Sequence, residues 1–411
     1  MQMPDNQQRP LHILVLCNKM PYPSNDGGTI ATLNMIMGLA AQGNIVDVLA
    51  MQTPKHNFPL EKLSDELKQN INWHSVWIDT DIRVGRMLKN LLFSRLPYNA
   101  ERFVSEEFNT KLKELLQNNY DIVQLEGLYL SNYISTIRKN SKSAISLRSH
   151  NVERQIWDRL AATEKNPAKR IYKKILAHRI GSLESLALKQ IDLLVPITKN
   201  DAEKLPFEPK NTYVAPTGIE PHKFEPYKEP AVGKSLFYIG ALDWEPNQEA
   251  VIWFARNVWT DIFSMHPDWE FHIAGRNAPD SFANEIRKYP VVFDGQVASA
   301  QEYIERHNIM VVPLLSGSGM RIKIIEAMAH SRCVVTTPIG AEGIDAENGR
   351  QILIGTSPDE LKQQILKAIG DAEYTHKVAN EAFAFTNANF NNRKIISGLN
   401  QFYKQWLQRL Q

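Results

Sequence analysis

The stretch "LHILVLCNKMPYPSNDGGTIATLNMIMGLAAQGNIVDVLAM", residues 11–51, decides the fold class because it contains a strand, a helix and a second strand in succession. Residues 11–18 form a short apolar run that ends in a turn, as expected of a buried strand. Residues 29–43 repeat apolar side chains at helical spacing until Gly43 ends the helix, and residues 45–51 return to an apolar run. This order predicts a parallel sheet covered by helices.

The same alternation continues through the rest of the chain, with a further helical pattern at residues 247–263. Further strands are predicted at residues 121–127, 144–150, 192–198, 212–218, 235–242, 269–275, 291–297, 309–315, 333–340 and 351–355. The sequence therefore predicts an α/β protein with two Rossmann-like, doubly wound parallel-sheet domains that face a common cleft.

The domain boundary is predicted where the periodic pattern stops. Residues 220–233 are rich in proline and charge and follow neither the helical nor the strand period. They are interpreted as a linker between an N-terminal domain, residues 1–219, and a C-terminal domain, residues 234–393. The last segment, residues 394–411, is predicted to be an amphipathic helix that needs a docking surface. Its apolar stripe consists of Ile396, Leu399, Phe402, Trp406 and Leu410.

Composition excludes several classes of protein. The 411 residues carry 22% charged side chains and a formal net charge of +2, which fits neither a disordered chain nor a strongly basic nucleic-acid binder. The two cysteines, Cys17 and Cys333, give neither a disulfide framework nor a metal-ligand spacing. The apolar run at residues 11–17 lacks the features of a signal peptide, and no run approaches the roughly 18 residues of a membrane span. A soluble, cytoplasmic protein is therefore expected.

Two basic segments leave two interpretations open. Residues 83–103 and 165–179 mix cationic with large apolar side chains. Such segments can lie on an anionic membrane surface as peripheral contacts. The ordinary alternative is a pair of solvated helix faces.

Asp26, Gly27 and Gly28 follow the first predicted strand and precede a helix. The glycines would let backbone N–H groups approach an anion at the start of that helix. The loop lacks the pattern G-x-G-x-x-G, and no acidic residue ends the strand at 45–51 to hold a ribose, so a dinucleotide is not expected. A plain turn is the alternative.

A second candidate group follows two other strands of the first half. His150, Asn151 and Glu153 come directly after the strand at 144–150, and Glu126 ends the strand at 121–127. The carboxyl ends of parallel strands line the binding crevice, which favours a functional histidine. The alternatives are a hydrogen-bonded structural histidine, and a helix cap formed by Glu153 with Asn151.

The strongest local signal is "SGSGMRIKIIEAMAHS", residues 316–331. Gly317 and Gly319 free the backbone after a strand, and Arg321 and Lys323 then fall in the first turn of a helix, where the helix dipole disfavours cations. A bound diphosphate would compensate them. The alternative is an ordinary surface ion pair between Lys323 and Glu326.

The sequence resembles the GT-B-fold glycosyltransferases, specifically the retaining family four (glycosyltransferase group 1). The resemblance rests on "DGGTIATLNMIMGLAAQG", "SHNVE", "VAPTGIEPHKF", "FYIGALDWEPNQEAV" and above all "GSGMRIKIIEAMAHSRCVVTTPIGAEGI". It implies a catalytic set of His150, Arg321 and Lys323, with His150 near the transferred sugar and the two cations on the donor diphosphate. It also implies that the terminal helix packs back on the first domain. The implied donor site consists of Gly240, Gly275, Arg276, Val297, Gly317, Ser318, Gly319, Met320 and Glu326.

By this resemblance the protein is a retaining, metal-independent, hexosyltransferase-like enzyme without a cofactor. It would move a sugar from a nucleoside-diphosphate donor to a hydroxyl of a glycan or lipid-linked acceptor, in the cytoplasm or at the inner face of the membrane. Surface polysaccharide synthesis is the implied setting, and no nucleic acid is involved. Two departures affect the donor: Ser318 stands where the family has a glutamate, and "GALDWEPN" lacks the usual arginine and lysine. A catalytically silent nucleotide-sugar-binding subunit, or an epimerase or hydrolase, is the alternative.

Overall fold

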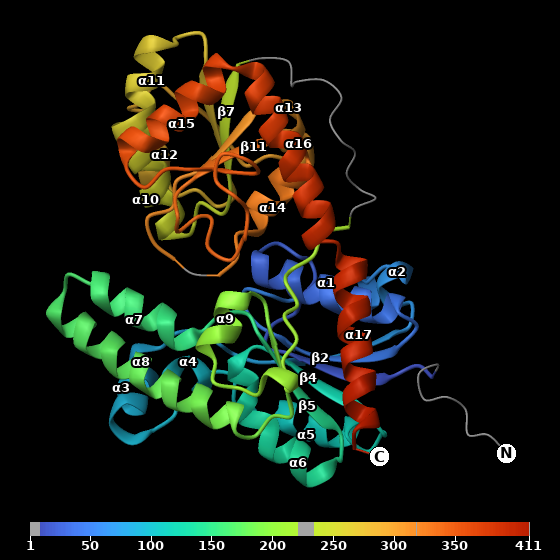
Figure 1. The fold of residues 1–411 in the computed structure, drawn as a ribbon. Coiled ribbons are helices and arrows are strands. Elements are labelled where there is room, and N and C mark those ends of the chain that lie inside the picture. The colour runs from blue at the N-terminus through green and yellow to red at the C-terminus, as the bar shows by residue number, and fades with distance from the viewer. Residues whose placement is uncertain (1–8, 221–233, 318, 411) are drawn as a thin grey trace. The chain divides into compact units, whose positions relative to one another are not determined.

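The computed structural model describes residues 9–220, 234–317 and 319–410. The chain folds as two compact units, Met1–Gly218 with Asn392–Gln411, and Ile219–Asn391 (Figure 1). Except for Glu220, the predicted linker at 220–233 lies outside the described residues.

The first unit is built on a six-stranded parallel sheet in the order β3-β2-β1-β4-β5-β6. Its strands are β1 (His12–Cys17), β2 (Ile45–Gln52), β3 (Ile71–Trp77), β4 (Ile122–Glu126), β5 (Ala144–Ser149) and β6 (Leu193–Pro196). Alternate residues of β1 face opposite layers: Ile13 and Val15 belong to one apolar cluster, and Leu14 and Leu16 to the other. Both faces of the sheet are therefore buried, which explains the continuous apolar runs in the sequence.

Helices cover both faces of this sheet. They are α1 (Gly27–Ala41), α2 (Asp65–Lys68), α3 (Val84–Phe93), α4 (Tyr98–Glu101), α5 (Glu106–Leu115), α6 (Ile134–Asn140), α7 (Glu153–Thr163), α8 (Pro167–Leu188), α9 (Lys199–Lys204) and α17 (Asn392–Gln408), with 3-10 turns at Leu60–Lys62, Leu128–Tyr133 and Pro209–Asn211. One apolar cluster contains α1 and α17, and the other contains α5, α6 and α8. In Figure 1, α7 and α8 run side by side as a long pair.

One strand prediction in the first unit was wrong, and one strand was missed. Residues 212–218 are not a strand, because they bond to β6 through the N–H groups of Tyr213 and Ala215 alone, and Pro216 has no N–H to donate. β3 was missed because it lies at the edge of the sheet, where its half-exposed residues hide the apolar run.

The terminal helix α17 packs on α1 of the first unit, as the resemblance implied. Ile395, Ile396 and Leu399 are buried in the cluster that contains α1. The helices approach so closely that a Cβ on Gly38 of α1 would lie 2.6 Å from Ile396 Cγ1. The predicted stripe was wrong at its end, since Leu410 follows the helix and is 67% exposed.

The second unit repeats the same architecture, with a six-stranded parallel sheet in the order β12-β11-β10-β7-β8-β9. Its strands are β7 (Ser235–Ile239), β8 (Glu270–Ala274), β9 (Val292–Gly295), β10 (Ile309–Val312), β11 (Cys333–Thr336) and β12 (Leu353–Ile354), and all six predicted strands are confirmed. Its helices are α10 (Glu245–Phe254), α11 (Thr260–Met265), α12 (Asp280–Ile286), α13 (Ala300–Arg306), α14 (Ile322–Ala329), α15 (Pro358–Gly370) and α16 (Ala372–Asn389), with a π-helical turn at Ala255–Trp259.

No helix within the described residues is both long and apolar enough to cross a membrane.

Candidate functional site

In each sheet the first strand of the unit lies in the middle. The next two strands are added on one side of it, and the chain then crosses over to add the remaining strands on the other side. In the first unit, β1 is followed by β2 and β3 on one side, and the chain then crosses to β4 on the other. In the second unit, β7 and β10 flank the same reversal. Open α/β sheets bind ligands outside the carboxyl ends of the strands at such a switch point. Each unit therefore contains one candidate site.

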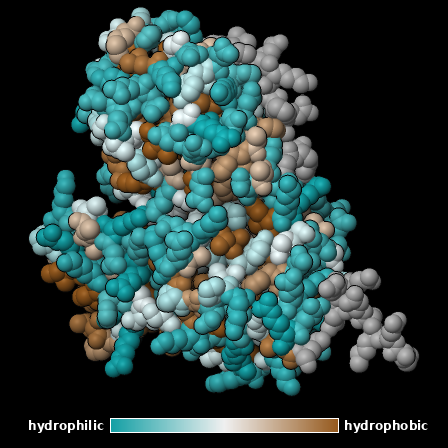
Figure 2. Space-filling model, viewed as in Figure 1, coloured by the Kyte–Doolittle hydropathy of each residue, from teal (hydrophilic) through white to brown (hydrophobic). Residues whose placement is uncertain are grey.

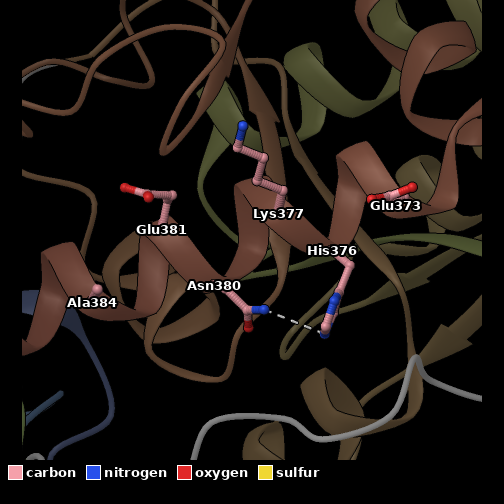
Figure 3. Close-up of a pocket in the computed structure, with 6 residues that line it drawn as sticks. All are labelled: Glu373, His376, Lys377, Asn380, Glu381 and Ala384. Atoms are coloured by element: carbon pink, nitrogen blue, oxygen red, sulfur yellow. Dashed lines mark hydrogen bonds between the residues drawn. The ribbon is translucent and has the colours of Figure 1, made fainter.

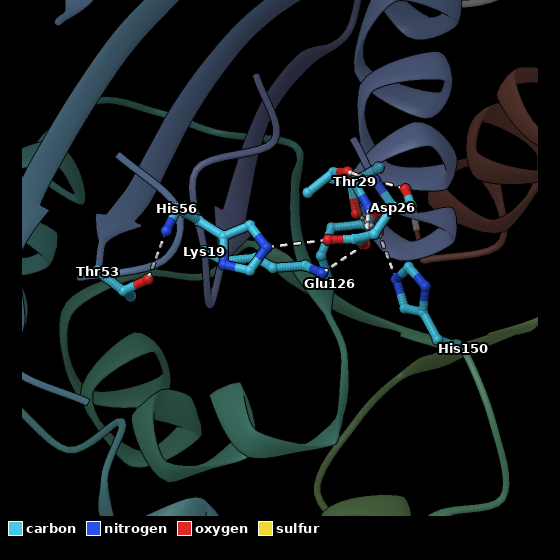
Figure 4. Close-up of polar contacts among 8 residues, drawn as sticks. Lys19, Asp26, Thr29, Thr53, His56, Glu126 and His150 are labelled. Atoms are coloured by element: carbon cyan, nitrogen blue, oxygen red, sulfur yellow. Dashed lines mark hydrogen bonds and ion pairs between the residues drawn. The ribbon is translucent and has the colours of Figure 1, made fainter. Parts of the chain in front are cut away.

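Glu126, the last residue of β4, is the centre of a buried hydrogen-bond network in the first unit (Figure 4). Its side chain is 1% exposed, and Oε2 accepts from Arg148 Nη1 at 3.1 Å and from Thr32 Oγ1 at 3.1 Å, and lies 2.9 Å from His150 Nε2. Gln124 donates to the other carboxylate oxygen. Burial alone would raise the pKa of Glu126, but Arg148 and His150 hold that pKa at about 2. The carboxylate is therefore ionised at neutral pH.

His150 follows β5 and is oriented by this carboxylate. Burial lowers the pKa of His150, and Glu126 only partly offsets the effect, so the ring is neutral near pH 7. Because an ionised carboxylate can only accept, Nε2 carries the hydrogen that faces Glu126, and Nδ1 keeps its lone pair. A neutral histidine fixed in this tautomer can accept a hydrogen bond from a hydroxyl group.

The predicted anion loop after β1 is capped by its own carboxylate. Asp26 is the N-cap of α1: its Oδ1 accepts from the Thr29 N–H at 2.9 Å, and its own N–H donates to Thr29 Oγ1 at 3.0 Å. Gly27 and Gly28 follow in the first turn of the helix. This capping box places a negative charge at the positive end of the helix dipole. The start of α1 is therefore already stabilised by an anion that belongs to the protein.

Two side chains that the sequence reasoning did not single out converge on Asp26. Lys19 Nζ donates to Asp26 Oδ1 at 2.8 Å, and His56 Nε2 lies 2.9 Å from Asp26 Oδ2 (Figure 4). Burial alone would raise the pKa of Asp26, but hydrogen bonds from His56 and Lys19 hold that pKa well below its ordinary value. A Cβ on Gly28 would lie 3.0 Å from Lys19 Nζ, so the glycine makes room for the ammonium group. Asp26, Lys19 and His56 form one polar cluster beyond β1 and β2.

Glu153 contacts a different set of residues. It is the first residue of α7, its carboxylate accepts from Tyr129 Oη at 2.9 Å, and its N–H donates to Glu184 Oε1 at 3.0 Å. Val152 is the N-cap, so the helix start is satisfied by Glu184 rather than by the cap of Glu153 with Asn151 that the sequence allowed. Burial raises the pKa of both Glu153 and Glu184, that of Glu184 to about 7. Glu153 therefore shapes the turn into α7.

In the second unit, a glycine turn leads from β10 into α14. Gly317 has φ 119° and Gly319 has φ 79°, values that favour glycine. Arg321 is the N-cap of α14, and its Nη1 donates back to the Gly319 carbonyl at 2.7 Å. Met320 is half-buried against the apolar core, and Ser318 lies outside the described residues. The turn therefore holds the Arg321 guanidinium beside the start of α14.

Lys323 lies at the switch point between β7 and β10. Its Nζ donates to Tyr238 Oη at 2.8 Å and to Asn247 Oδ1 at 3.4 Å, and lies 4.5 Å from the centre of the Tyr238 ring. Burial, together with the nearby charge of Arg321, lowers the pKa of Lys323 to about 7. A Cβ on Gly240 would lie 2.6 Å from this Nζ, so Gly240 is required for the approach.

Glu326 lies one helical turn beyond Lys323, and burial raises its pKa to about 7. Within the described part of the chain, no carboxylate lies within 4.0 Å of Lys323 Nζ. The surface ion pair between the two residues, which the sequence left open, is therefore wrong. Ile324 and Ile325 face the core from α14, whereas Ile322 is only half-buried.

The remaining sequence-predicted residues of the second unit follow adjacent strands of one sheet edge. Gly275 and Arg276 come after β8, and Val297 follows β9. A Cβ on Gly275 would lie 2.1 Å from the Gly240 carbonyl oxygen, so only glycine fits between these two strands. The Arg276 carbonyl accepts from the Leu242 N–H at 3.0 Å. The structure thus brings these loops together beside Lys323, and their contact with a donor remains a prediction.

Sequence reasoning missed five residues of the two sites: Lys19, His56, Arg148, Tyr238 and Asn247. Lys19 directly follows the first predicted strand, so its position already pointed to the crevice. Arg148 was visible as a charge inside a predicted buried strand, where a partner is required. Tyr238 and Asn247 carried no local signal, because only the tertiary fold brings β7 and α10 to Lys323.

One surface hollow lies away from these residues (Figure 3). It is lined by Glu373, His376, Lys377, Asn380, Glu381 and Ala384, all of α16. A hollow formed along a single helix contains none of the predicted site residues. Among the residues that the structure describes, no group of three or more His, Cys, Asp or Glu side chains is arranged to hold a metal ion.

The fold is shared with known structures over nearly the whole chain. Sucrose-phosphate synthase from Thermosynechococcus elongatus superposes with a TM-score of 0.70 at 16% identity, covering 97% of this chain and all of that one. Anabaena Alr3699/HepE in complex with UDP and glucose superposes with a TM-score of 0.65 at 13% identity, covering 95% of this chain and 98% of the other. These similarities show the GT-B fold.

The sequence comparisons agree with that fold. Residues 233–371, which include β7, β10 and α14, match the family described as glycosyl transferases group 1. These findings support a GT-B glycosyltransferase. An uncharacterised 44.6 kDa protein in the cps region of Klebsiella pneumoniae is 24% identical over 401 residues, which covers 94% of this chain and 98% of that protein.

Proposed function

We propose that the protein transfers a sugar from a nucleoside-diphosphate donor to a hydroxyl of a glycan or lipid-linked acceptor, with retention at the anomeric carbon and without a metal or another cofactor. The observation that carries the proposal is the environment of Lys323. Its half-buried ammonium group donates hydrogen bonds to two neutral partners, and it lies in the first turn of α14 near the positive charge of Arg321. Burial and the neighbouring charge of Arg321 disfavour the ammonium form of Lys323, and an anionic ligand would favour it. The diphosphate of the donor is an anion of suitable charge.

The second unit would bind the donor. Negative charge develops on the diphosphate as the bond to the sugar breaks, and Arg321 and Lys323 would stabilise it where it develops. These two cations supply the positive charge that a metal ion provides in other phosphate chemistry. Glu326 would accept hydrogen bonds from the ribose hydroxyls, and Gly275 and Val297 would lie near the base.

The first unit would bind the acceptor. Because Asp26 already provides the negative charge at the start of α1, this loop fits a neutral hydroxyl-rich group better than a second anion. His150 Nδ1 would accept a hydrogen bond from a hydroxyl of the transferred sugar. A phosphate oxygen of the donor can take the proton of the acceptor hydroxyl, so no further general base is needed.

The setting we propose is surface polysaccharide synthesis, in the cytoplasm or at the inner face of the membrane. Support comes from the Klebsiella relative, which is encoded in a cps region. Nucleotide-sugar binding is supported by the Anabaena structure, which contains UDP and glucose.

The proposal is tested by thermal unfolding in the presence of UDP-, GDP- and ADP-sugars. One donor class should raise the melting temperature of the wild-type protein, because a ligand of the native state stabilises it. The Lys323→Ala variant should lose most of this shift. If no donor stabilises the wild-type protein, or if the variant responds like wild type, the donor site is not where we place it. Turnover with the stabilising donor then separates an enzyme from a silent binding subunit.

A further inference from the structure

Helix α3 is amphipathic, but its apolar side chains are exposed and its polar side is packed against the protein. Its one buried residue is the polar Asn90, whereas Val84, Leu88, Leu92 and Phe93 are 65%, 51%, 73% and 82% exposed. Ile82, just before the helix, is 71% exposed. Isolated exposed apolar residues are ordinary, but a contiguous group marks an interaction surface. These five residues are called the α3 face.

The orientation of α3 is fixed by partly buried hydrogen bonds. Asn90 Nδ2 donates to the Leu96 carbonyl at 2.9 Å and to Glu101 Oε2 at 2.5 Å. Arg179 of α8 donates to the Asn90 carbonyl at 3.2 Å and to the Leu91 carbonyl at 2.8 Å, which satisfies the last turn of α3. The polar side of the helix is therefore attached to the unit, and the apolar side is held outward.

The segment that forms the α3 face and the first half of α8 are both rich in cations, of which Arg83 pairs with Asp79 and Lys173 with Glu164. Residues 82–95 contain four Lys or Arg residues and residues 165–179 of α8 and its approach contain six, and neither segment contains an Asp or Glu. Ile171 and Ile175 of α8 are also apolar and are 61% and 37% exposed. In Figure 2, brown side chains gather at the lower left of the molecule, where Figure 1 places α3.

We infer that the α3 face docks on an anionic membrane surface. Large apolar side chains can enter the headgroup region, while Arg86, Lys89 and the cations of α8 keep their charges at the phosphates. A second copy of the chain fits less well, because a symmetric contact would bring each cationic rim against its own copy. An anionic lipid surface complements both the apolar centre and the basic border.

The inference rests on the proposed function in one respect, the lipid-linked acceptor. The α3 face belongs to the first unit, to which the acceptor is assigned. Membrane docking would hold that unit at the surface where a lipid-linked acceptor is embedded. Vesicle binding itself needs no turnover, so the two proposals fail separately.

The test is co-sedimentation with vesicles, using 30% phosphatidylglycerol in phosphatidylcholine against pure phosphatidylcholine. The wild-type protein should bind the anionic vesicles at least tenfold more tightly, and 0.5 M NaCl should weaken this binding. The double variant Leu88→Gln/Leu92→Gln should lose at least tenfold in partitioning, while its circular dichroism and melting temperature stay unchanged. Equal binding to both vesicle types, or wild-type binding by the double variant, would overturn the inference.

Matched controls come from similarly exposed apolar residues elsewhere. Met265→Gln in the second unit and Leu186→Gln on α8, at 50% and 53% exposure, should bind vesicles like wild type. Turnover on a water-soluble acceptor should be the same for the double variant and wild type. Sedimentation velocity tests the alternative that a second copy of the chain covers the α3 face. A wild-type dimer that the double variant abolishes would assign the α3 face to that second copy and refute membrane docking.

Discussion

The two switch points hold their charges in opposite ways. In the first unit, Glu126 is ionised and accepts from four donors, two of which, Arg148 and His150, hold its pKa at about 2. In the second unit, Lys323 meets two neutral groups, and burial beside Arg321 lowers its pKa to about 7. A satisfied network fixes geometry, whereas a cation disfavoured by its surroundings is prepared for an anionic ligand. Substitutions at the first site should therefore mainly change the free energy of unfolding, whereas substitutions at the second should mainly change donor binding and turnover.

The largest effect is expected from breaking the satisfied network. Arg148→Met leaves the Glu126 carboxylate buried without its cation, which should lower the free energy of unfolding of the first unit by about 3–5 kcal/mol. Adding Glu126→Gln to Arg148→Met removes the buried charge and should restore much of the loss. Chemical denaturation of both variants measures this. A loss below about 1 kcal/mol in the single variant would mean that the network does not stabilise the fold.

The same network gives a pH dependence with a defined sign. Glu126 has a pKa of about 2 in the folded chain against an ordinary value of 4.5, so its contribution is fully present above about pH 4.5. It is lost as the pH falls through about 2. The Arg148→Met/Glu126→Gln variant should lack this component of acid unfolding.

The next largest effect should appear in the second unit as a loss of turnover. Lys323→Ala should lower kcat/KM by roughly 2–4 kcal/mol of transition-state stabilisation, or about thirtyfold to a thousandfold, by analogy with removing one oxyanion donor. Lys362→Ala is the matched control, because Lys362 forms a surface ion pair with Asp261 and should change neither activity nor stability by more than about 1 kcal/mol. Unchanged turnover in Lys323→Ala would remove the assigned role.

A smaller effect, on turnover, is expected from replacing His150, which belongs to the Glu126 network and is also proposed to contact the sugar. His150→Ala should lower kcat, because the transition state would lose one hydrogen bond to a charged or polarised group. Such a bond contributes about 1.5–3 kcal/mol, and nucleotide affinity should change little. Turnover and thermal shifts with the same donor separate the two quantities. Weakened donor binding with unaltered turnover would give His150 a different role.

The smallest expected effect is the pH dependence of donor affinity. Because the pKa of Lys323 is about 7 in the free protein, a donor that needs the ammonium form should bind most tightly below pH 7. Affinity should fall about tenfold between pH 6 and pH 8, which is about 1.4 kcal/mol. Calorimetric titrations with a nucleotide sugar measure this slope. Lys323→Arg should flatten it while Glu326→Gln keeps it, and a slope that follows Glu326 instead would reassign the titrating group.

Much of the fold was readable from local pattern. Buried parallel strands are continuous apolar runs, and eleven of the twelve predicted strands, counting those at 11–18 and 45–51, lie where the runs predicted them. The edge strand β3 and the segment at 212–218 escaped because exposure at a sheet edge removes the apolar signal and because Pro216 removes a donor. The two errors in the first unit therefore have different causes, the exposure of an edge strand and the missing N–H of a proline.

The sites were only partly readable. Glycines, Arg321 and Lys323 could be singled out because their order along the chain places them after a strand and at a helix start. Their electrostatic state could not be predicted, because the surroundings of the Lys323 ammonium group include Tyr238 and Asn247. These residues are 85 and 76 positions away in the chain. The capping of α1 by Asp26 was within reach of local sequence, whereas the contacts of His56 and Lys19 with it were not.

Helices α3 and α17 show where the sequence alone stops. Both alternate apolar and polar side chains at helical spacing, and this pattern determines that each helix has an apolar side needing cover. In α17, Ile395, Ile396 and Leu399 are buried against α1, whereas in α3 Asn90 is the buried residue and Leu92 stays exposed. The sequence thus determined which elements form and which charges meet a helix start. The tertiary structure decided what covers each face and which partners set each pKa, because burial and Coulomb interactions depend on residues that are distant in the chain.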